Sequence, residues 1–136
     1  MHRTWLAAPL VLALWACERD VPAAYRSVVV PAARLGDPAA RERGRELFAR
    51  HCALCHGERG DGRGERRAGL SMPPRDFTDP TWQARTSSLR IFVAVREGVP
   101  GTSMPAWGAL SPEDTWDLVA YLRSLAELPA PARGAR

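Results

Sequence analysis

The feature that most constrains this chain is one short pattern, Cys52-Ala53-Leu54-Cys55-His56. Two thiols three positions apart, followed at once by an imidazole, are the arrangement that covalent haem attachment requires. The thiols can add to the two vinyl groups on one porphyrin edge, and the adjacent imidazole can reach the iron. The pattern therefore predicts one haem c, bonded through Cys52 and Cys55, with His56 as an axial iron ligand.

Other uses of a cysteine pair fit this sequence less well. A structural zinc site needs four ligands, commonly from a second Cys or His pair, and the remaining candidates are Cys17, His2 and His51. Thioredoxin-like chemistry places its cysteine pair in an α/β fold, whereas the residues before Cys52 have the pattern of a helix. A simple disulfide within the pair would leave the adjacent histidine unexplained.

Helix signals lie on both sides of the pattern. Asp37-Pro38 combines an N-cap aspartate with a proline at the first helical position, so a helix is predicted from Pro38 to the first cysteine. Further helix starts are predicted at Asp79-Pro80, Ser87-Ser88 and Ser111-Pro112. The last helix carries an apolar stripe, and we expect it to pack across the first helix near Gly44 and Phe48. The coarse prediction is an all-α domain.

A glycine-rich stretch, residues 57–69, suits a loop running around a cofactor. It lacks the Lys-Ser/Thr ending of a phosphate-binding loop. The prolines that follow, Pro73 and Pro74, have free carbonyl oxygens, and one of the two is predicted to accept the Nδ1–H of His56 and orient its ring. The guanidinium of Arg75 is a candidate partner for a haem propionate, with plain surface solvation as the alternative.

Two methionines compete for the second axial position on the iron. A thioether is a soft, neutral ligand that favours the reduced state. Met72 lies 16 positions after His56, whereas Met104 lies 48 positions after it, beyond two predicted helices. Ligands on opposite faces of the ring require the chain to pass around it, so Met104 is the predicted ligand and Met72 a contact at the haem edge.

The N-terminal residues resemble an export signal. The apolar run Trp5–Ala16 is too short for the ~20 residues that cross a bilayer, and it follows a basic start. Leu14-Trp15-Ala16-Cys17 is similar to a bacterial lipoprotein signal, which predicts lipidation of Cys17. The segment after it contains prolines and is predicted to be a tether, although its valine run, 28–30, could instead pack on the domain.

The basic balance of the chain does not indicate a nucleic-acid partner. All 19 cationic residues are arginines, and the net charge is +4. No arginine-rich run or nucleic-acid motif accompanies this charge. We interpret the arginines as a solvated surface.

Together, the attachment pattern, the Gly60-Asp61-Gly62-Arg63-Gly64 loop, Met104-Pro105 and the capped last helix resemble a class I c-type cytochrome. The resemblance implies a small cytochrome c fold, with crossing N- and C-terminal helices, covalent haem in the core, and iron ligation by His56 and Met104. It also implies transfer of electrons through an exposed haem edge.

These observations divide the chain into four parts: a signal peptide (1–16), a lipidated cysteine and tether (17–37), a cytochrome c domain (38–128) and a C-terminal tail (129–136). The location predicted is the periplasmic side of a bacterial membrane.

The leading hypothesis is a membrane-tethered carrier, or a small cytochrome subunit of a respiratory oxidoreductase complex, that is not itself an enzyme. Its partners would be redox proteins or such a complex. One alternative is a haem enzyme or gas sensor with a labile sixth ligand, and another is an assembly subunit in which haem mainly stabilises the fold. Because a domain of about ninety residues is marginally stable alone, the apoprotein is predicted to be largely unfolded.

Overall fold

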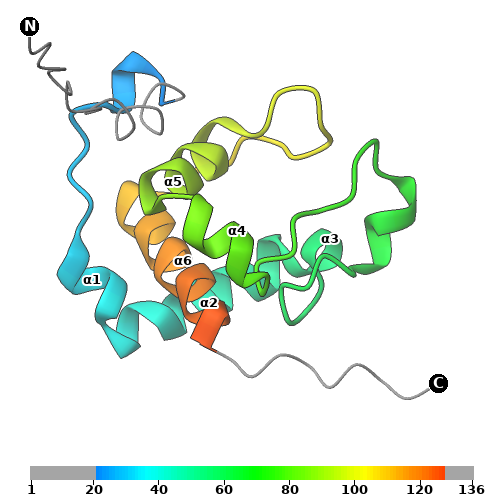
Figure 1. The fold of residues 1–136 in the computed structure, drawn as a ribbon, viewed down its shortest axis with the longest axis horizontal. Helices are drawn as coiled ribbons and strands as arrows, with labels where there is room; N and C mark the ends of the chain where they lie inside the picture. The colour runs from blue at the N-terminus through cyan, green and yellow to red at the C-terminus, as the bar shows by residue number, and fades with distance from the viewer. Residues whose placement is uncertain (1–20, 128–136) are drawn as a thin grey trace, which may run out of the picture.

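The computed structural model describes residues 21–127, and their regular structure is entirely helical (Figure 1). The α-helices are α1 (Ala32–Gly36), α2 (Pro38–His51), α3 (Ala53–His56), α4 (Pro80–Arg85), α5 (Ser88–Glu97) and α6 (Pro112–Ser124). Three short 3₁₀ turns accompany them, namely η1 (Ala23–Tyr25), η2 (Glu65–Gly69) and η3 (Leu125–Glu127). The predicted all-α fold class is confirmed.

The helices begin where their capping residues predict. The Asp37 carboxylate accepts the backbone N–H of Ala39 at the start of α2. In the same way, the Ser111 hydroxyl accepts the N–H of Asp114 at the start of α6. Such caps satisfy N–H groups that have no partner inside the helix. Local sequence therefore determines the boundaries of the two longest helices.

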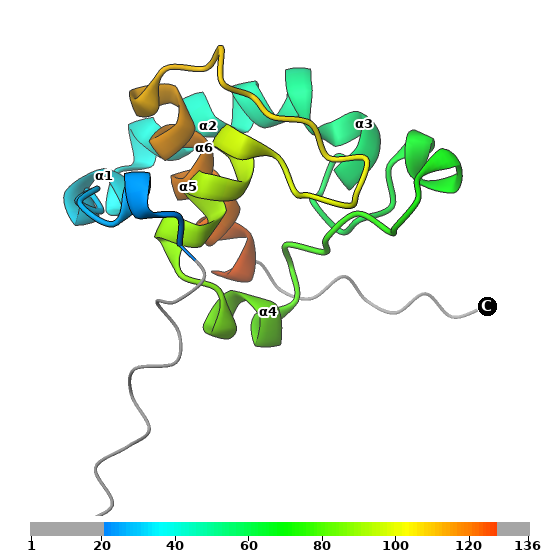
Figure 2. The ribbon, with the colours of Figure 1, turned by 90° about the horizontal axis from the view of Figure 1, so that it is seen from above.

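Helices α2 and α6 cross and pack against each other (Figures 1 and 2), and Gly44 of α2 lies at their contact. A Cβ atom at Gly44 would lie 2.0 Å from the backbone oxygen of Asp117, so no larger residue fits at this crossing. One turn further along, the rings of Phe48 and Tyr121 lie 5.3 Å apart. The predicted contact between the first and last helices is therefore present, near the residues expected.

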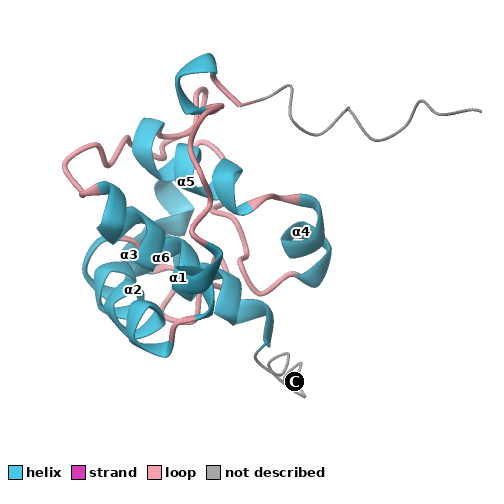
Figure 3. Cartoon of the chain, turned by 90° about the vertical axis from the view of Figure 1, so that its left-hand side faces the viewer, coloured by secondary structure: helices cyan, strands magenta, loops and turns pink. Residues whose placement is uncertain are grey.

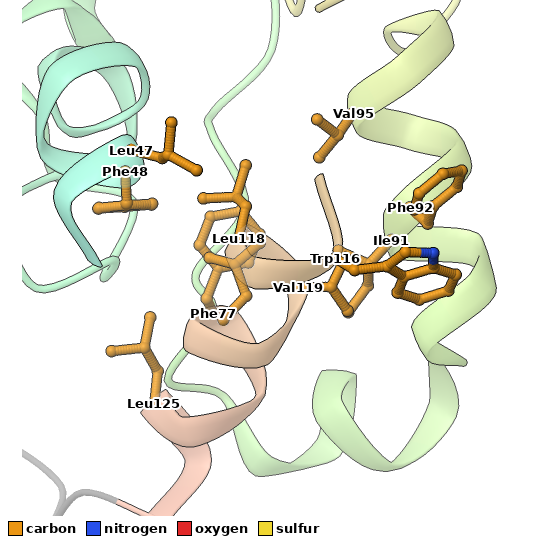
Figure 4. Close-up of a cluster of buried hydrophobic side chains, with 11 residues drawn as sticks. Leu47, Phe48, Phe77, Ile91, Phe92, Val95, Trp116, Leu118, Val119 and Leu125 are labelled. Carbon is orange, nitrogen blue, oxygen red and sulfur yellow. The ribbon is translucent and has the colours of Figure 1, made fainter. Parts of the chain in front are cut away.

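The hydrophobic core lies between α2, α5 and α6, with Phe77 added from the loop before α4 (Figure 4). Phe48, Leu118 and Val119 are buried completely or almost completely. The full cluster consists of Leu47, Phe48, Phe77, Ile91, Phe92, Val95, Trp116, Leu118, Val119, Leu122 and Leu125. This core fixes the end of α2, from which the attachment pattern continues.

The segment predicted to be a tether is folded onto the domain. We call residues 21–36 the N-terminal arm, and Figure 3 shows it running across one face of the domain from α1 to η1. Val28, Val30 and Leu35 pack against the core. The tether prediction for residues 17–37 is therefore wrong over the arm, because its apolar side chains find a surface to cover. The alternative, packing of the valine run, is what occurs.

Several sequence predictions lie outside the described residues. The signal peptide, 1–16, and the lipidated Cys17 are among them, as is the tail, 129–136. Within residues 21–127, no helix has the length and apolar character needed to span a bilayer.

Candidate haem site

The short helix α3 presents the two cysteines and the histidine on a single turn. The Cys52 N–H donates to the carbonyl of Phe48 over 2.8 Å, so α3 continues directly from the end of α2. The His56 N–H in turn donates to the Cys52 carbonyl over 2.9 Å. Both cysteines are half-buried and neither forms a disulfide. Burial, reinforced by the nearby Cys55, raises the pKa of the Cys52 thiol to about 12.

The His56 ring is held in one orientation from two directions. It is 8% exposed, and it stacks on the Phe77 ring with centroids 4.6 Å apart. Its Nδ1 lies 3.1 Å from the carbonyl oxygen of Arg75. A carbonyl can only accept, so Nδ1 carries the proton and Nε2 is left as the metal-binding nitrogen. Burial lowers the pKa of His56, against the Arg75 hydrogen bond that raises it, and so favours the neutral ligand form.

The acceptor for His56 corrects the sequence prediction. Pro73 and Pro74 were the predicted acceptors, but the carbonyl of Arg75 takes this role. The register follows from a backbone bond, because the Phe77 N–H donates to the Gly60 carbonyl over 2.7 Å and so positions the residues before Phe77. The Arg75 side chain itself is exposed, and its contact with a haem propionate remains a prediction.

A second loop, residues 98–110, carries Met104 and begins at a glycine. Gly98 has φ +73°, and a Cβ there would lie 2.8 Å from the Met104 carbonyl oxygen. Glycine adopts this left-handed conformation at little cost, so the loop can turn tightly at the end of α5. The loop returns to the helices at Trp107, whose N–H donates to the Val95 carbonyl over 2.9 Å. The Trp107 ring also packs on His51, with centroids 5.1 Å apart.

The two loops beside the attachment turn touch each other. The hydroxyls of Ser71 and Ser103 lie 3.3 Å apart. This contact joins the loop of residues 57–76 to the loop of residues 98–110. Each serine is adjacent in sequence to a methionine. Met104 is half-buried, whereas the side chain of Met72 is 56% exposed.

The residues around the turn fit a haem c. In residues 57–76 and 98–110, the only fully buried positions are glycines, and the large apolar side chains Trp107 and Leu110 are only partly buried against the core. Two thiols, a neutral imidazole with Nε2 left to bind, and a thioether on the neighbouring loop are the donors that a c-type haem uses. A flat apolar cofactor would give both loops a surface to pack on.

Comparison with known proteins agrees with this chemistry. Residues 39–122 match the family described as cytochrome c oxidase, cbb3-type, subunit III. The chain belongs to this family. It is a mono-haem c-type cytochrome domain, and Cys52–His56 fits the haem c attachment motif. The predicted family resemblance and the predicted cofactor are both confirmed.

Individual relatives place the cytochrome domain within larger proteins. The cbb3-type cytochrome c oxidase subunit FixP of Azorhizobium caulinodans is 36% identical over 91 residues, covering 66% of this chain and 29% of the relative. Thiosulfate dehydrogenase of Stutzerimonas stutzeri is 32% identical over 85 residues, or 60% of this chain and 26% of the relative. The chain therefore spans less than a third of the length of these curated relatives.

The match to one solved structure runs over almost the whole length of that structure's chain. The KustC0563 c-type cytochrome is 38% identical, with a TM-score of 0.52, and the match covers 60% of this chain and 95% of that one. The small cytochrome c fold predicted from the sequence is thus confirmed. The part of our chain that most clearly extends the domain is the N-terminal arm, which precedes the family match at residue 39.

Proposed function

We propose that this c-type cytochrome carries single electrons, with His56 and Met104 as the residues that would bind the iron of its haem c. A haem of this kind supplies an iron that gains and loses one electron. The observation that carries the proposal is the fixed, buried imidazole of His56, whose Nδ1–H is bound by the Arg75 carbonyl beside the two cysteines.

The protein's own residues would do three things for that chemistry. Cys52 and Cys55 would hold the cofactor by thioether bonds, and His56 would present Nε2 to the iron in a fixed orientation. The half-buried Met104 would supply a thioether as the second ligand of the iron. With His56 and Met104 both bound to the iron, small molecules would have no open site on it, so the protein would move electrons without rearranging bonds. We infer that it is not itself an enzyme.

For its location and partners, we propose an exported protein on the periplasmic side of a bacterial membrane, lipidated at Cys17. The lipoprotein-type pattern that ends at Cys17 supports this. The family match and the FixP relatives support a membrane oxidoreductase complex, or a redox protein that serves one, as the partner.

The second candidate, a haem enzyme or gas sensor, would need an open or labile iron position. One relative is a thiosulfate dehydrogenase, and this is the reason to keep an enzyme as the second candidate. The half-buried position of Met104, on a loop tied down at Trp107, favours the carrier.

A matched pair of methionine variants tests the ligand assignment. In the holoprotein, Met104→Ala is expected to abolish the weak far-red band of methionine-ligated ferric haem and to lower the reduction potential, because a neutral thioether favours ferrous iron. Met72→Ala should leave both unchanged. Loss of the band in Met72→Ala alone would reassign the ligand, and a far-red band absent from the parent protein would contradict methionine ligation altogether.

A further inference from the structure

The distance from Cys17 to the folded domain is set by where the N-terminal arm starts to pack. Val21, the first described residue, is only 6% exposed, and shortly after it Tyr25 packs against the core. Whatever conformation residues 18–20 have, the four residue steps from Cys17 to Val21 span at most about 14 Å. A flexible tether over 17–37 would instead reach about 70 Å at full extension and about 25 Å on average.

The arm is fastened to the domain at both of its ends. Near its start, the Tyr25 ring lies 6.2 Å from that of Phe92, edge to face, and the Tyr25 hydroxyl donates to the Glu97 carboxylate. Near its end, Arg34 Nε binds Asp117 Oδ1 over 2.6 Å, and the Asp117 side chain is 1% exposed. The arm and the domain would therefore move as one body, so a restraint at Val21 would act on the whole domain.

The arm and the haem attachment turn lie at opposite ends of the domain. Figures 1 and 2 are related by a turn about the horizontal axis, and in both η1 lies towards the left while α3 and η2 lie towards the right. A short connection between Cys17 and Val21 would therefore keep the η1 side of the domain close to the membrane anchor. The other end, with α3, is free to point away.

The side chains exposed on the arm suit a lipid surface. Val29 is 84% exposed, the highest value among the exposed large apolar side chains of the described residues. Arg26 is also exposed and cationic. Apolar and cationic side chains together are compatible with the interfacial region of an anionic bilayer.

We propose that the exposed side chains of residues 22–29, in the first part of the arm, form a membrane-contacting surface that holds the domain on the bilayer with α3 and η2 directed away from the lipid. The proposal rests on lipidation of Cys17, which was proposed above. The occupant of this surface is the lipid bilayer itself. Redox partners would then approach the attachment end of the domain from the aqueous side.

Two matched label positions test this orientation. Ala24 in η1 and Ala68 in η2 are both exposed alanines in short 3₁₀ turns at opposite ends. Ala24→Cys and Ala68→Cys, made in the lipidated holoprotein, would carry a nitroxide spin label in phosphatidylethanolamine–phosphatidylglycerol vesicles. The haem absorption spectrum checks that each variant is folded. Power saturation with a nickel-chelating lipid headgroup then reports how often each label meets the membrane surface.

The expected result is collision several times more frequent at position 24 than at position 68. Inserting about 15 flexible Gly and Ser residues after Asp20, which adds roughly 20 Å of average reach, should bring the ratio close to one. Equal collision at both positions in the parent protein overturns the proposal, as does a ratio that the insertion does not change.

Failure of lipidation is recognised separately. A mature protein whose mass lacks the lipid, and which does not sediment with vesicles, overturns both the anchor and this orientation. The same protein, if it retains its haem mass and its redox activity, leaves the electron-carrier proposal standing.

Discussion

The helical half of the domain and the loop half differ in what they bury. Helices α2, α5 and α6 enclose large apolar side chains such as Phe48, Phe92 and Leu118. The loops of residues 57–76 and 98–110 surround the attachment turn, but their only fully buried residues are glycines, and Trp107 and Leu110 are buried only in part. The first half therefore has a core made of its own side chains, whereas the second half needs the covalently bound haem to complete its core.

This difference separates stability from chemistry. The helical half fixes the end of α2, and α3 continues from it, so the position of His56 is inherited from a well-packed region. The loop half contributes the Arg75 carbonyl, which binds His56, and Met104, the proposed second ligand of the iron. Changes in the helices should alter stability most, and changes in the loops should alter the iron most.

The largest expected effect is that of removing the cofactor. In the double variant Cys52→Ala, Cys55→Ala, produced without haem, we expect the chain to lose its cooperative thermal transition and most of its helical signal in far-ultraviolet circular dichroism. The reason is that half of a small domain would have no core. A native-like, cooperative transition in this apoprotein would show that the helical half is sufficient by itself.

The next effect is expected at the crossing of α2 and α6. In Gly44→Ala, the new Cβ would meet the Asp117 carbonyl at 2.0 Å and force the helices apart. We expect a loss of about 3 kcal/mol in the free energy of unfolding of the holoprotein, measured by denaturant titration. Gly36→Ala is the matched control, since a Cβ there meets nothing within 4 Å. Equal stabilities of the two variants would contradict the close crossing.

A buried carboxylate should give a smaller, pH-dependent effect. Burial raises the pKa of Asp117, but hydrogen bonds from Arg43 and Arg34 outweigh it and hold the pKa below its usual value. The charge therefore contributes stability that is fully present above the unfolded-state pKa, about 4, and is lost as the pH falls through the folded-state pKa.

Asp117→Asn tests this contribution. We expect it to cost about 1–3 kcal/mol at pH 7 and to flatten the decline of stability below pH ~4. Unfolding by guanidinium at a series of pH values, for parent and variant, measures the difference. A constant difference between the two proteins from neutral to acidic pH would mean that the carboxylate's charge is not responsible.

The smallest effect is expected where the two loops touch. The Ser71–Ser103 hydrogen bond is exposed and 3.3 Å long, so Ser103→Ala should cost less than about 1 kcal/mol of global stability. The far-red haem band should remain. If this variant instead lost the band, the loop contact would be needed to position Met104. The arrangement of the loops would then depend on their own contacts, and less on packing against haem than we infer.

The sequence predicts most of the helical half because its signals are local. Capping pairs such as Asp37-Pro38 and Ser111-Pro112 act within one turn, and the helices begin there. Gly44 and Phe48 were predicted at the helix crossing from periodicity alone, and they are found there. The attachment pattern is equally local, since all of its chemistry lies within five positions.

What the sequence did not reveal depends on contacts between distant segments. The carbonyl that binds His56 belongs to Arg75 because a backbone hydrogen bond between Phe77 and Gly60 sets the register. Such a backbone bond cannot be predicted from the types of the residues that form it. The prolines of the arm predict an extended tether, whereas the ion pair that fixes the arm joins Arg34 to Asp117, 83 positions apart. The residues near Arg34 in the sequence do not indicate that its partner is a buried aspartate.

The most direct test of the central claim is a spectroscopic redox titration of the purified holoprotein. We predict one haem per chain, a reversible one-electron transition, and low-spin spectra in both oxidation states that cyanide does not quickly change. A high-spin ferric spectrum with rapid cyanide binding would contradict the account and would identify a haem site open to substrates.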